Sequence, residues 1–141
     1  MVMKATQTMN GQFGKLFHDG VWMTNITSAQ ASVEIGKEEI KIAGSRWIGH
    51  KQVSLTGSGT MTGYKITNDL AKKIGNVFYA RNKSFVTELV MKIDDVDNPK
   101  GKVWIRLMGV QFDVIPLLNY EHGSIVTEET PFTFYGFQYL A

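Results

Sequence analysis

The 141-residue sequence contains no cysteine, which excludes disulfide bonds, thiolate zinc sites and cysteine nucleophiles. It has no apolar run of membrane-spanning length, and its first residues, MVMKATQTMNGQFG, are polar and lack an apolar signal core. We therefore expect a protein that is made in the cytoplasm and is soluble there. An excess of one charge is also nearly absent, because fifteen basic and thirteen acidic residues give a formal net charge of +2. That value is too small to argue for stable nucleic-acid binding, which needs clustered cations.

The composition indicates one globular domain over residues 1–141. Hydrophobic residues make up 43% of the chain and charged residues 20%, which is a globular profile rather than a disordered one. The length allows a sizeable core and leaves little room for a second domain.

The stretch from Arg46 to Lys65 has the clearest pattern in the sequence. From Gln52 to Thr62 the residues alternate in type, which predicts a β-strand with one buried and one wet face. The predicted buried face holds Val53, Leu55 and Met61, with Gly57 and Gly59 between them. The predicted wet face carries only hydroxyls: Ser54, Thr56, Ser58, Thr60 and Thr62. A stripe without charge suits a surface past which something slides, or a face covered by a polar neighbour. A threonine-rich strand of a small β domain would also explain it.

Residues 36–51 are predicted to form an extended loop that leaves the core. Glycines punctuate the segment, and charged residues mix with Ile40, Ile42, Trp47 and Ile48. Exposed apolar groups rimmed by charge are typical of interaction surfaces. The alternative is that these residues fold back onto the core. Residues 1–13 are polar and form a predicted N-terminal arm, which either frays or docks on another subunit.

The remaining segments predict a mainly β protein with one helix. Asp19-Gly20 between two apolar runs predicts a tight hairpin, and residues 26–35 alternate again. Residues 68–80 carry one apolar stripe behind an Asn68 N-cap and predict a helix that packs on the sheet. Further strands are expected at 84–93, at 102–114 with a bulge at Gly109, and at 125–140. The expected fold is a β-barrel or β-sandwich of about seven antiparallel strands with one flanking α-helix.

No motif predicts catalysis, a cofactor or a metal site, so we do not expect an enzyme. The glycine-rich run from Gly57 to Gly63 lacks the spacing of a phosphate-binding loop and lies inside an alternating strand. The acidic run from Asp94 to Asn98 lacks the central glycine and closing glutamate of an EF-hand, which favours a solvated turn. The three histidines have no ligand spacing: His18, His50 and His122. Glu128 and Glu129 are predicted to be a charged edge or an inter-subunit contact.

Several segments together resemble one family. These are GKLFHDG at 14–20, GSR at 44–46 followed by GHK at 49–51, GSGTMTGYK at 57–65 and ETPFTF at 129–134. In this order and spacing they resemble the tail tube proteins of contractile-tailed phages, defective-prophage particles and phage-tail-like bacteriocins. The similarity covers nearly the whole chain, and no single motif is diagnostic alone.

The resemblance implies a structural protein that self-assembles into stacked hexameric rings with a continuous inner β-barrel. The resulting hollow tube would lie inside a sheath, in an assembled phage tail or extracellular tail-like particle, and would conduct DNA or breach a membrane. The implied partners are further copies of the chain, the tail sheath protein, and baseplate and tail-terminator proteins, with transient passage of DNA through the lumen.

Two sets of site residues follow from combining the resemblance with the patterns. The inter-subunit or inter-ring contacts would be Glu38, Glu39, Lys41, Arg46, Trp47, Ile48, His50 and Lys51. The lumen lining would be Ser54, Thr56, Ser58, Thr60 and Thr62. The alternative function is a small-ligand-binding β-barrel, whose cavity the aromatic last strand would line.

Overall fold

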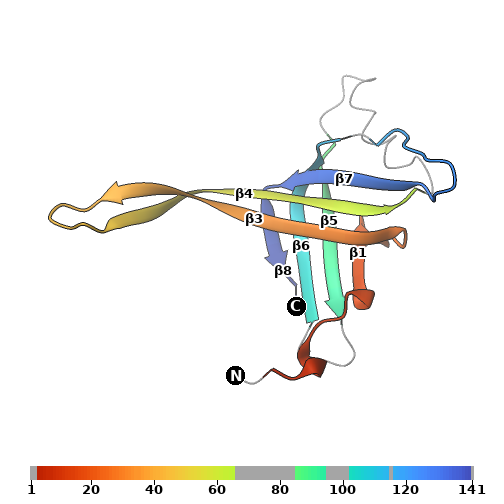
Figure 1. Cartoon of the computed structure of the whole chain (residues 1–141), viewed down its shortest axis with the longest axis horizontal. Helices are drawn as coiled ribbons and strands as arrows, with labels where there is room; N and C mark the ends of the chain where they lie inside the picture. The colour runs from red at the N-terminus through yellow and green to blue at the C-terminus, as the bar shows by residue number, and fades with distance from the viewer. Residues whose placement is uncertain (1–2, 66–84, 95–101, 115, 141) are drawn as a thin grey trace.

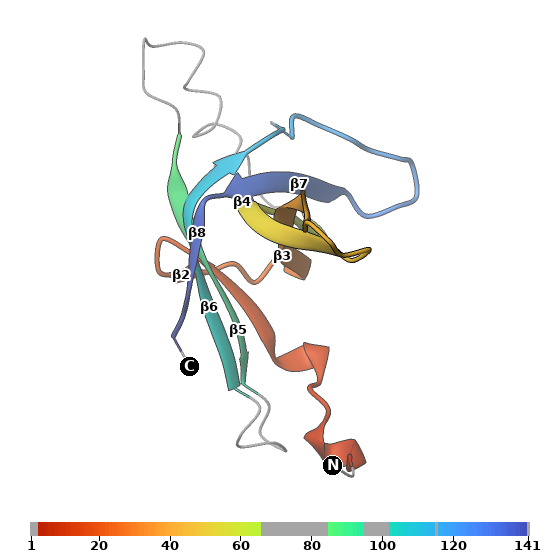
Figure 2. The same cartoon turned by 90° about the vertical axis from the view of Figure 1, so that its left-hand side faces the viewer.

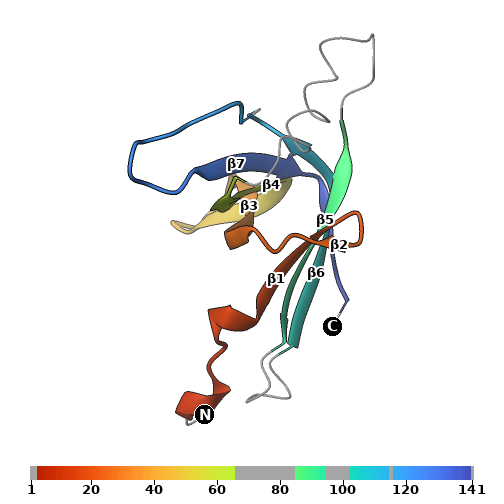
Figure 3. The ribbon, with the colours of Figure 1, turned by 90° about the vertical axis from the view of Figure 1, so that its right-hand side faces the viewer.

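The computed structural model describes residues 3–65, 85–94, 102–114 and 116–140. Within these residues, eight antiparallel strands are joined by hydrogen bonds into one continuous sheet. It folds into two layers, here called sheet A and sheet B, and the strands of one layer cross those of the other (Figure 1). Figures 2 and 3 show the two layers from opposite sides. The mainly β, antiparallel fold predicted from the sequence is confirmed, and the predicted helix at 68–80 lies outside the described residues.

Sheet A consists of β2, β1, β5, β6 and β8. Its strands are β1 (Gly14–His18), β2 (Val21–Trp22), β5 (Thr87–Asp94), β6 (Lys102–Phe112) and β8 (Gly136–Tyr139). The predicted hairpin between β1 and β2 is confirmed: Asp19 and Gly20 have φ of 52° and 80°, the positive values that a type I′ turn requires.

Sheet B consists of β3 (Ile26–Lys41), β4 (Ile48–Tyr64) and β7 (Thr127–Phe134), together with the end of β6. Strand β6 therefore belongs to both layers, pairing with β8 through Ile105–Met108 and with β7 through Gln111 and Phe112. The predicted bulge at Gly109 is confirmed. Gly109 has φ of 66°, the register shifts between Thr87 and Leu89 on the facing strand, and both Leu107 and Val110 point into the core.

The core lies between the sheets. Leu16, Leu89, Leu107 and Val110 come from sheet A, and Met61, Phe132 and Phe134 come from sheet B. The glycines of β4 make room for the two phenylalanines. A Cβ atom at Gly57 would lie 2.5 Å from the Phe134 ring, and one at Gly59 would lie 2.7 Å from the Phe132 ring. Glycine is thus required at these strand positions because an aromatic ring occupies the space.

The strand predicted at 125–140 is two strands. The chain bends at Tyr135, after which β8 leaves β7 and pairs with β6 in the other sheet. The Tyr135 ring lies against Gly109, where a Cβ atom would lie 1.7 Å from the ring. The chain therefore bends at the position where the Tyr135 ring fills the space beside Gly109, which has no side chain.

The sandwich does not close into a barrel through the strands that are described. The pairing order is β2-β1-β5-β6-β7-β4-β3, so β2 and β3 end the path. Strand β3 pairs with β4 only, which leaves its other edge open for hydrogen bonding. The N-terminal arm contains two short 3₁₀ turns, Ala5–Gln7 and Gly11–Phe13, and is exposed apart from a half-buried Phe13.

Candidate assembly surfaces

Strands β3 and β4 extend well beyond the sandwich as a two-stranded hairpin (Figure 1). The segment predicted as an extended loop at 36–51 is mostly strand. Strand β3 continues to Lys41 and β4 begins at Ile48, so only 42–47 lie outside the strands. The sequence missed this because the glycines at 36 and 49 lie within the strands and do not end them. We call residues 36–53 the distal hairpin.

The eight predicted contact residues all lie in the distal hairpin and are exposed. Glu38, Glu39 and Lys41 are on β3, Arg46 and Trp47 are in the turn, and Ile48, His50 and Lys51 are on β4. Trp47 is 82% exposed, so it does not fold back onto the core. Ile40, Ile42 and Ile48 are also about half exposed, at 45%, 51% and 50%. The hairpin therefore holds large apolar side chains in water, with Ile40 and Ile42 on one face and Ile48, opposite Lys41, on the other. Exposed apolar groups rimmed by charge are typical of interaction surfaces.

The tip of the distal hairpin is an ordered turn. Gly44 has φ of 76°, the Ser45 amide donates to the Ile42 carbonyl at 3.2 Å, and the Trp47 amide donates to the Ser45 hydroxyl at 3.1 Å. The Ile42 side chain lies near Gly49, where a Cβ atom would be 3.6 Å from its Cδ1. The turn therefore presents Trp47 from a defined backbone.

The charges of the distal hairpin are not paired with each other. Glu38 lies directly opposite Lys51, and Glu39 lies opposite His50, yet no ion pair joins either couple anywhere in the described hairpin. By contrast, the predicted edge residue Glu128 forms an ion pair with Lys65 at the other end of β4. The distal charges remain available for a partner.

The outward face of sheet B is lined with hydroxyl groups. On β4, Ser58, Thr60 and Thr62 lie on this face because Gly57, Gly59, Met61 and Gly63 face the core. Ser54 and Thr56 continue the row and are exposed. The structure thus places all five predicted lumen residues in one row on one strand.

Neighbouring strands widen this row into a surface that the sequence did not reveal. The register sets Ser28, Gln30 and Ser32 of β3 opposite Thr62, Thr60 and Ser58. On the other side Thr133 of β7 lies opposite Ser58. The signal is present in the sequence, because residues 26–35 alternate and their polar positions therefore share one face. We call this surface the hydroxyl face. Its charged positions on β3, β4 and β7 are Glu34 and Glu129, with no Lys or Arg.

The prediction that Val53 and Leu55 are buried is wrong. Their side chains are 58% and 69% exposed. The reason is that β4 leaves the sandwich near Thr56, so no second layer covers this part of the strand. Val53 also has no partner in the register, because Gly36 pairs with Ser54 and Lys37 with Gln52, which is a bulge.

A groove lies where the two sheets part, between the edge of β3 and sheet A. Its volume is about 390 Å³, and its wall is mainly apolar: Leu16, Ile26, Met91, Ile93, Val103 and Ile105. This groove is a feature that fits the ligand-binding alternative, although the aromatic last strand does not line it.

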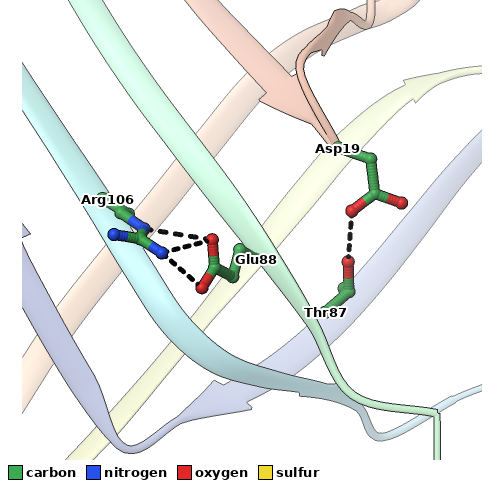
Figure 4. Close-up of polar contacts among 4 residues, drawn as sticks. All are labelled: Asp19, Thr87, Glu88 and Arg106. Carbon is green, nitrogen blue, oxygen red and sulfur yellow. Dashed lines mark hydrogen bonds and ion pairs between the residues drawn. The ribbon is translucent and has the colours of Figure 1, made fainter.

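Three polar side chains meet at the β1–β2 turn, a cluster that the sequence did not predict. The Thr87 hydroxyl donates to Asp19 Oδ1 at 3.1 Å (Figure 4). The same hydroxyl lies 3.0 Å from His18 Nε2. Asp19 Oδ2 lies 3.7 Å from the same Nε2. A nucleophilic relay needs the hydroxyl and the carboxylate on opposite ring nitrogens. This arrangement ties the turn to β5 and does not build a relay.

The described residues hold no cluster of three or more His, Asp or Glu suited to a metal ion. Among those same residues, no helix has the length and apolarity needed to cross a membrane.

Comparison with known proteins is decisive at the level of family. The family model described as phage tail tube protein matches residues 1–141. The chain belongs to the phage tail tube protein family. It is 34% identical over 138 residues to XkdM of the phage-like element PBSX of Bacillus subtilis (strain 168), covering 97% of this chain and 93% of the relative.

Solved structures share the fold at low identity. In the extended sheath–tube complex of the extracellular contractile injection system PVC, one chain matches with a TM-score of 0.75 and 7% identity over 99% of both chains. A chain in the tail of an empty gene transfer agent particle, resolved with C6 symmetry, matches with a TM-score of 0.60 and 15% identity over 95% of this chain and 100% of that chain. Other neighbours come from a sheath/tube terminator and a baseplate. The predicted family and mainly β, antiparallel class are confirmed.

Proposed function

We propose that this chain assembles into stacked hexameric rings that form the hollow inner tube of a contractile tail or tail-like particle. The observation that carries the proposal is the distal hairpin, which is ordered, exposes Trp47 and three isoleucines, and contributes nothing to the core of its own subunit. Such a segment gains its burial energy only in a second subunit, at about 1.5–3 kcal/mol for each large side chain that becomes buried.

The strand directions of sheet B suit a closed ring. The sheet has an even number of alternating strands, in the order β6-β7-β4-β3, and β3 ends it with an open edge. The β3 edge of one copy can therefore meet the opposite edge of the next copy in antiparallel fashion all round the ring. A head-to-tail interface of this kind closes when the rotation permits. Six copies are the number that the family resemblance implies, and the related tail particle with C6 symmetry supports it.

In this ring the hydroxyl face would line the lumen. A conduit for a long polymer must bind it weakly everywhere along its length. A surface of hydroxyls with two carboxylates and no cation offers DNA phosphates no counter-charge. The wall therefore suits transient passage of DNA without stable binding. A particle that breaches a membrane without DNA would use the same bore.

The remaining proposed partners belong to the particle around the tube. They are the sheath protein outside it, a baseplate at one end and a tail terminator at the other. The role is structural rather than enzymatic, and the chain would be made in the bacterial cytoplasm before joining the particle.

Negative-stain electron microscopy of the purified chain at rising concentration, with light-scattering mass, tests the proposal. Rings or hollow tubes of uniform bore are expected. The same samples are repeated with the baseplate of the particle added, which supplies a nucleus for assembly. A chain that stays monomeric in both series contradicts the proposal.

The groove between the sheets favours small-ligand binding as the second candidate. Its volume and apolar wall are in the range of ligand pockets. A thermal-shift screen with apolar ligands tests it. A stabilising ligand bound by a chain that never forms rings would favour this function.

A further inference from the structure

The sandwich has a second outward face, on sheet A, and its chemistry differs from that of the hydroxyl face. Figure 2 shows sheet A as one layer and β3, β4 and β7 as the other. Four side chains form a band across sheet A: Trp22 on β2, Lys15 on β1, Lys92 on β5 and Trp104 on β6. Lys15 and Lys92 face outward because their chain neighbours Leu16 and Met91 face the core. The register places Trp104 opposite Lys92, and Trp22 opposite Phe17, which lies two residues after Lys15 and so on the same side. We call this band the lysine–tryptophan face.

The two lysines are held over the two indole rings. Lys15 Nζ lies 4.7 Å from the centroid of the Trp22 ring, and Lys92 Nζ lies 4.1 Å from that of Trp104. Each ammonium group keeps its charge near an aromatic surface, a geometry that restricts a flexible side chain to one place. The lysines are thereby positioned before any partner arrives.

The lysine pair lacks a counter-charge in the parts of the chain that are described. Lys15 and Lys92 are directly opposite each other in the β1–β5 register, an arrangement of like charges that destabilises a sheet. Neither has a carboxylate within ion-pair distance there. Trp104 Nε1, buried beneath this face, is likewise a donor without an acceptor in the same parts of the chain. Donors thus outnumber acceptors across the band.

Arg106 lies on the same face and, unlike the two lysines, forms an ion pair. Its guanidinium donates to both oxygens of Glu88, at 2.7 Å and 2.8 Å through one nitrogen, and to Oε2 again at 3.0 Å through Nε (Figure 4). These hydrogen bonds, followed by the charge of Glu88, raise the pKa of Arg106 above its ordinary value. Arg106 is neutralised within the chain, whereas Lys15 and Lys92 are not.

We infer that the lysine–tryptophan face binds an acidic segment of the sheath subunit. The inference rests on the proposed function: if the hydroxyl face lines the bore, the opposite face of the sandwich lies on the outside of the tube, where the sheath surrounds it. Carboxylates of such a segment would neutralise Lys15 and Lys92 and relieve their mutual repulsion. A duplex DNA partner fits less well, because a stable complex with duplex DNA needs many more cations than the two lysines of this face.

The test uses tubes assembled from the whole chain and the purified sheath subunit of the same particle. The variant carries Lys15→Glu with Lys92→Glu, and its matched control carries Lys15→Arg with Lys92→Arg, which keeps both charges and the ring contacts. Sheath binding is measured by co-sedimentation at low and high salt, and electron microscopy records the tubes before the sheath is added. We expect tubes of normal length in both variants. Sheath binding should be about tenfold weaker for the glutamate pair, unchanged for the arginine pair, and weaker for the unmodified chain at high salt.

The outcomes separate this inference from the proposed function. If no chain forms tubes, the proposed function fails before the sheath is added. Tubes that form normally and bind sheath equally well with the glutamate pair overturn the inference alone. Loss of tubes only in the glutamate variant would assign the face to subunit contacts and also overturn it. A gel-shift assay with duplex DNA completes the test, because DNA bound by wild-type tubes and released by the glutamate pair would assign the face to nucleic acid.

Discussion

The two halves of the β3–β4 hairpin have similar alternating sequences and opposite environments. In the inner half, Ala31, Val33 and Met61 pack in or against the core, and the glycines of β4 accept the rings of Phe132 and Phe134. In the distal half, Ile40 and Trp47 are exposed to water. The difference lies in what covers the strands, because sheet A crosses only the inner half (Figure 1).

This comparison separates two uses of apolar side chains. Burial in the inner half stabilises the folded subunit. Burial of the distal half, in our proposal, occurs only between subunits and therefore stabilises the tube. Substitutions in the two halves should then affect different measurements: the free energy of unfolding for the inner half, and assembly for the distal half.

The largest effect on folding is expected for Gly59→Ala in the inner half. A Cβ atom there would lie 2.2 Å from the Gln30 carbonyl oxygen and 2.7 Å from the Phe132 ring, so the backbone has to move. We expect a loss of about 3 kcal/mol in the free energy of unfolding, measured by urea denaturation. Gly49→Ala in the distal half is the matched control. Its Cβ atom would meet only ordinary contacts at 3.6 Å and 3.7 Å, so a change within about 0.5 kcal/mol is expected. Equal losses at both sites would remove the distinction between the halves.

Trp47→Ala in the distal half should impair assembly and leave the stability of the subunit unchanged. Trp47 contacts no part of the core, so its removal should change the free energy of unfolding by less than about 0.5 kcal/mol. Tube formation should be abolished or the tubes shortened, as seen by electron microscopy, because an exposed tryptophan is the strongest candidate anchor of an interface. A variant that loses its fold would instead assign Trp47 to the core. Normal tubes would remove Trp47 from the interface.

The hydroxyl face offers a third test of the comparison. Thr56 lies where β4 leaves the sandwich, at the boundary between the two halves, and Thr60 lies in the inner half. Replacing both with Trp leaves the core untouched but places bulky groups on the outward face. We expect normal assembly and impaired passage. Passage is measured as DNA delivery by the particle, or as membrane depolarisation if the particle carries no DNA. Failure of assembly would show that these residues are packed between subunits rather than luminal.

The sequence predicted most of the inner half of the hairpin, together with a turn and a bulge of sheet A. The alternation at 26–35 and 52–62, the Asp19-Gly20 turn and the Gly109 bulge are local signals, and the structure confirms each of them apart from the burial of Val53 and Leu55. These signals were sufficient because period-two patterning and positive φ are properties of a few consecutive residues.

The errors concern features that depend on the other layer. Leu55 alternates correctly but lies beyond the edge of sheet A, and no local pattern reports where that edge is. Tyr135 lies in an uninterrupted aromatic run, yet the chain bends there because its ring occupies the space above Gly109, 26 positions earlier in the sequence. The lysine–tryptophan face likewise joins the β1–β2 hairpin to β5 and β6, which are distant from it in sequence, and only the register places its residues side by side.

The smallest predicted effects are expected when two glutamates, one beside the inner half of the hairpin and one in the distal half, are each replaced with glutamine. Glu128 pairs with Lys65 where the inner end of β4 meets β7, and both side chains are largely buried, with 23% and 14% exposure. Glu38 lies opposite Lys51 in the distal half without forming an ion pair. Glu128→Gln should therefore lower the free energy of unfolding by about 1 kcal/mol, because the Lys65 ammonium loses its charged partner and keeps only the Leu117 carbonyl. Glu38→Gln should leave the unfolding free energy unchanged. If Glu38 serves a neighbouring subunit, that variant should instead raise the protein concentration at which tubes first appear. A destabilising Glu38→Gln together with a neutral Glu128→Gln would contradict the division of the hairpin into a folding half and an assembly half.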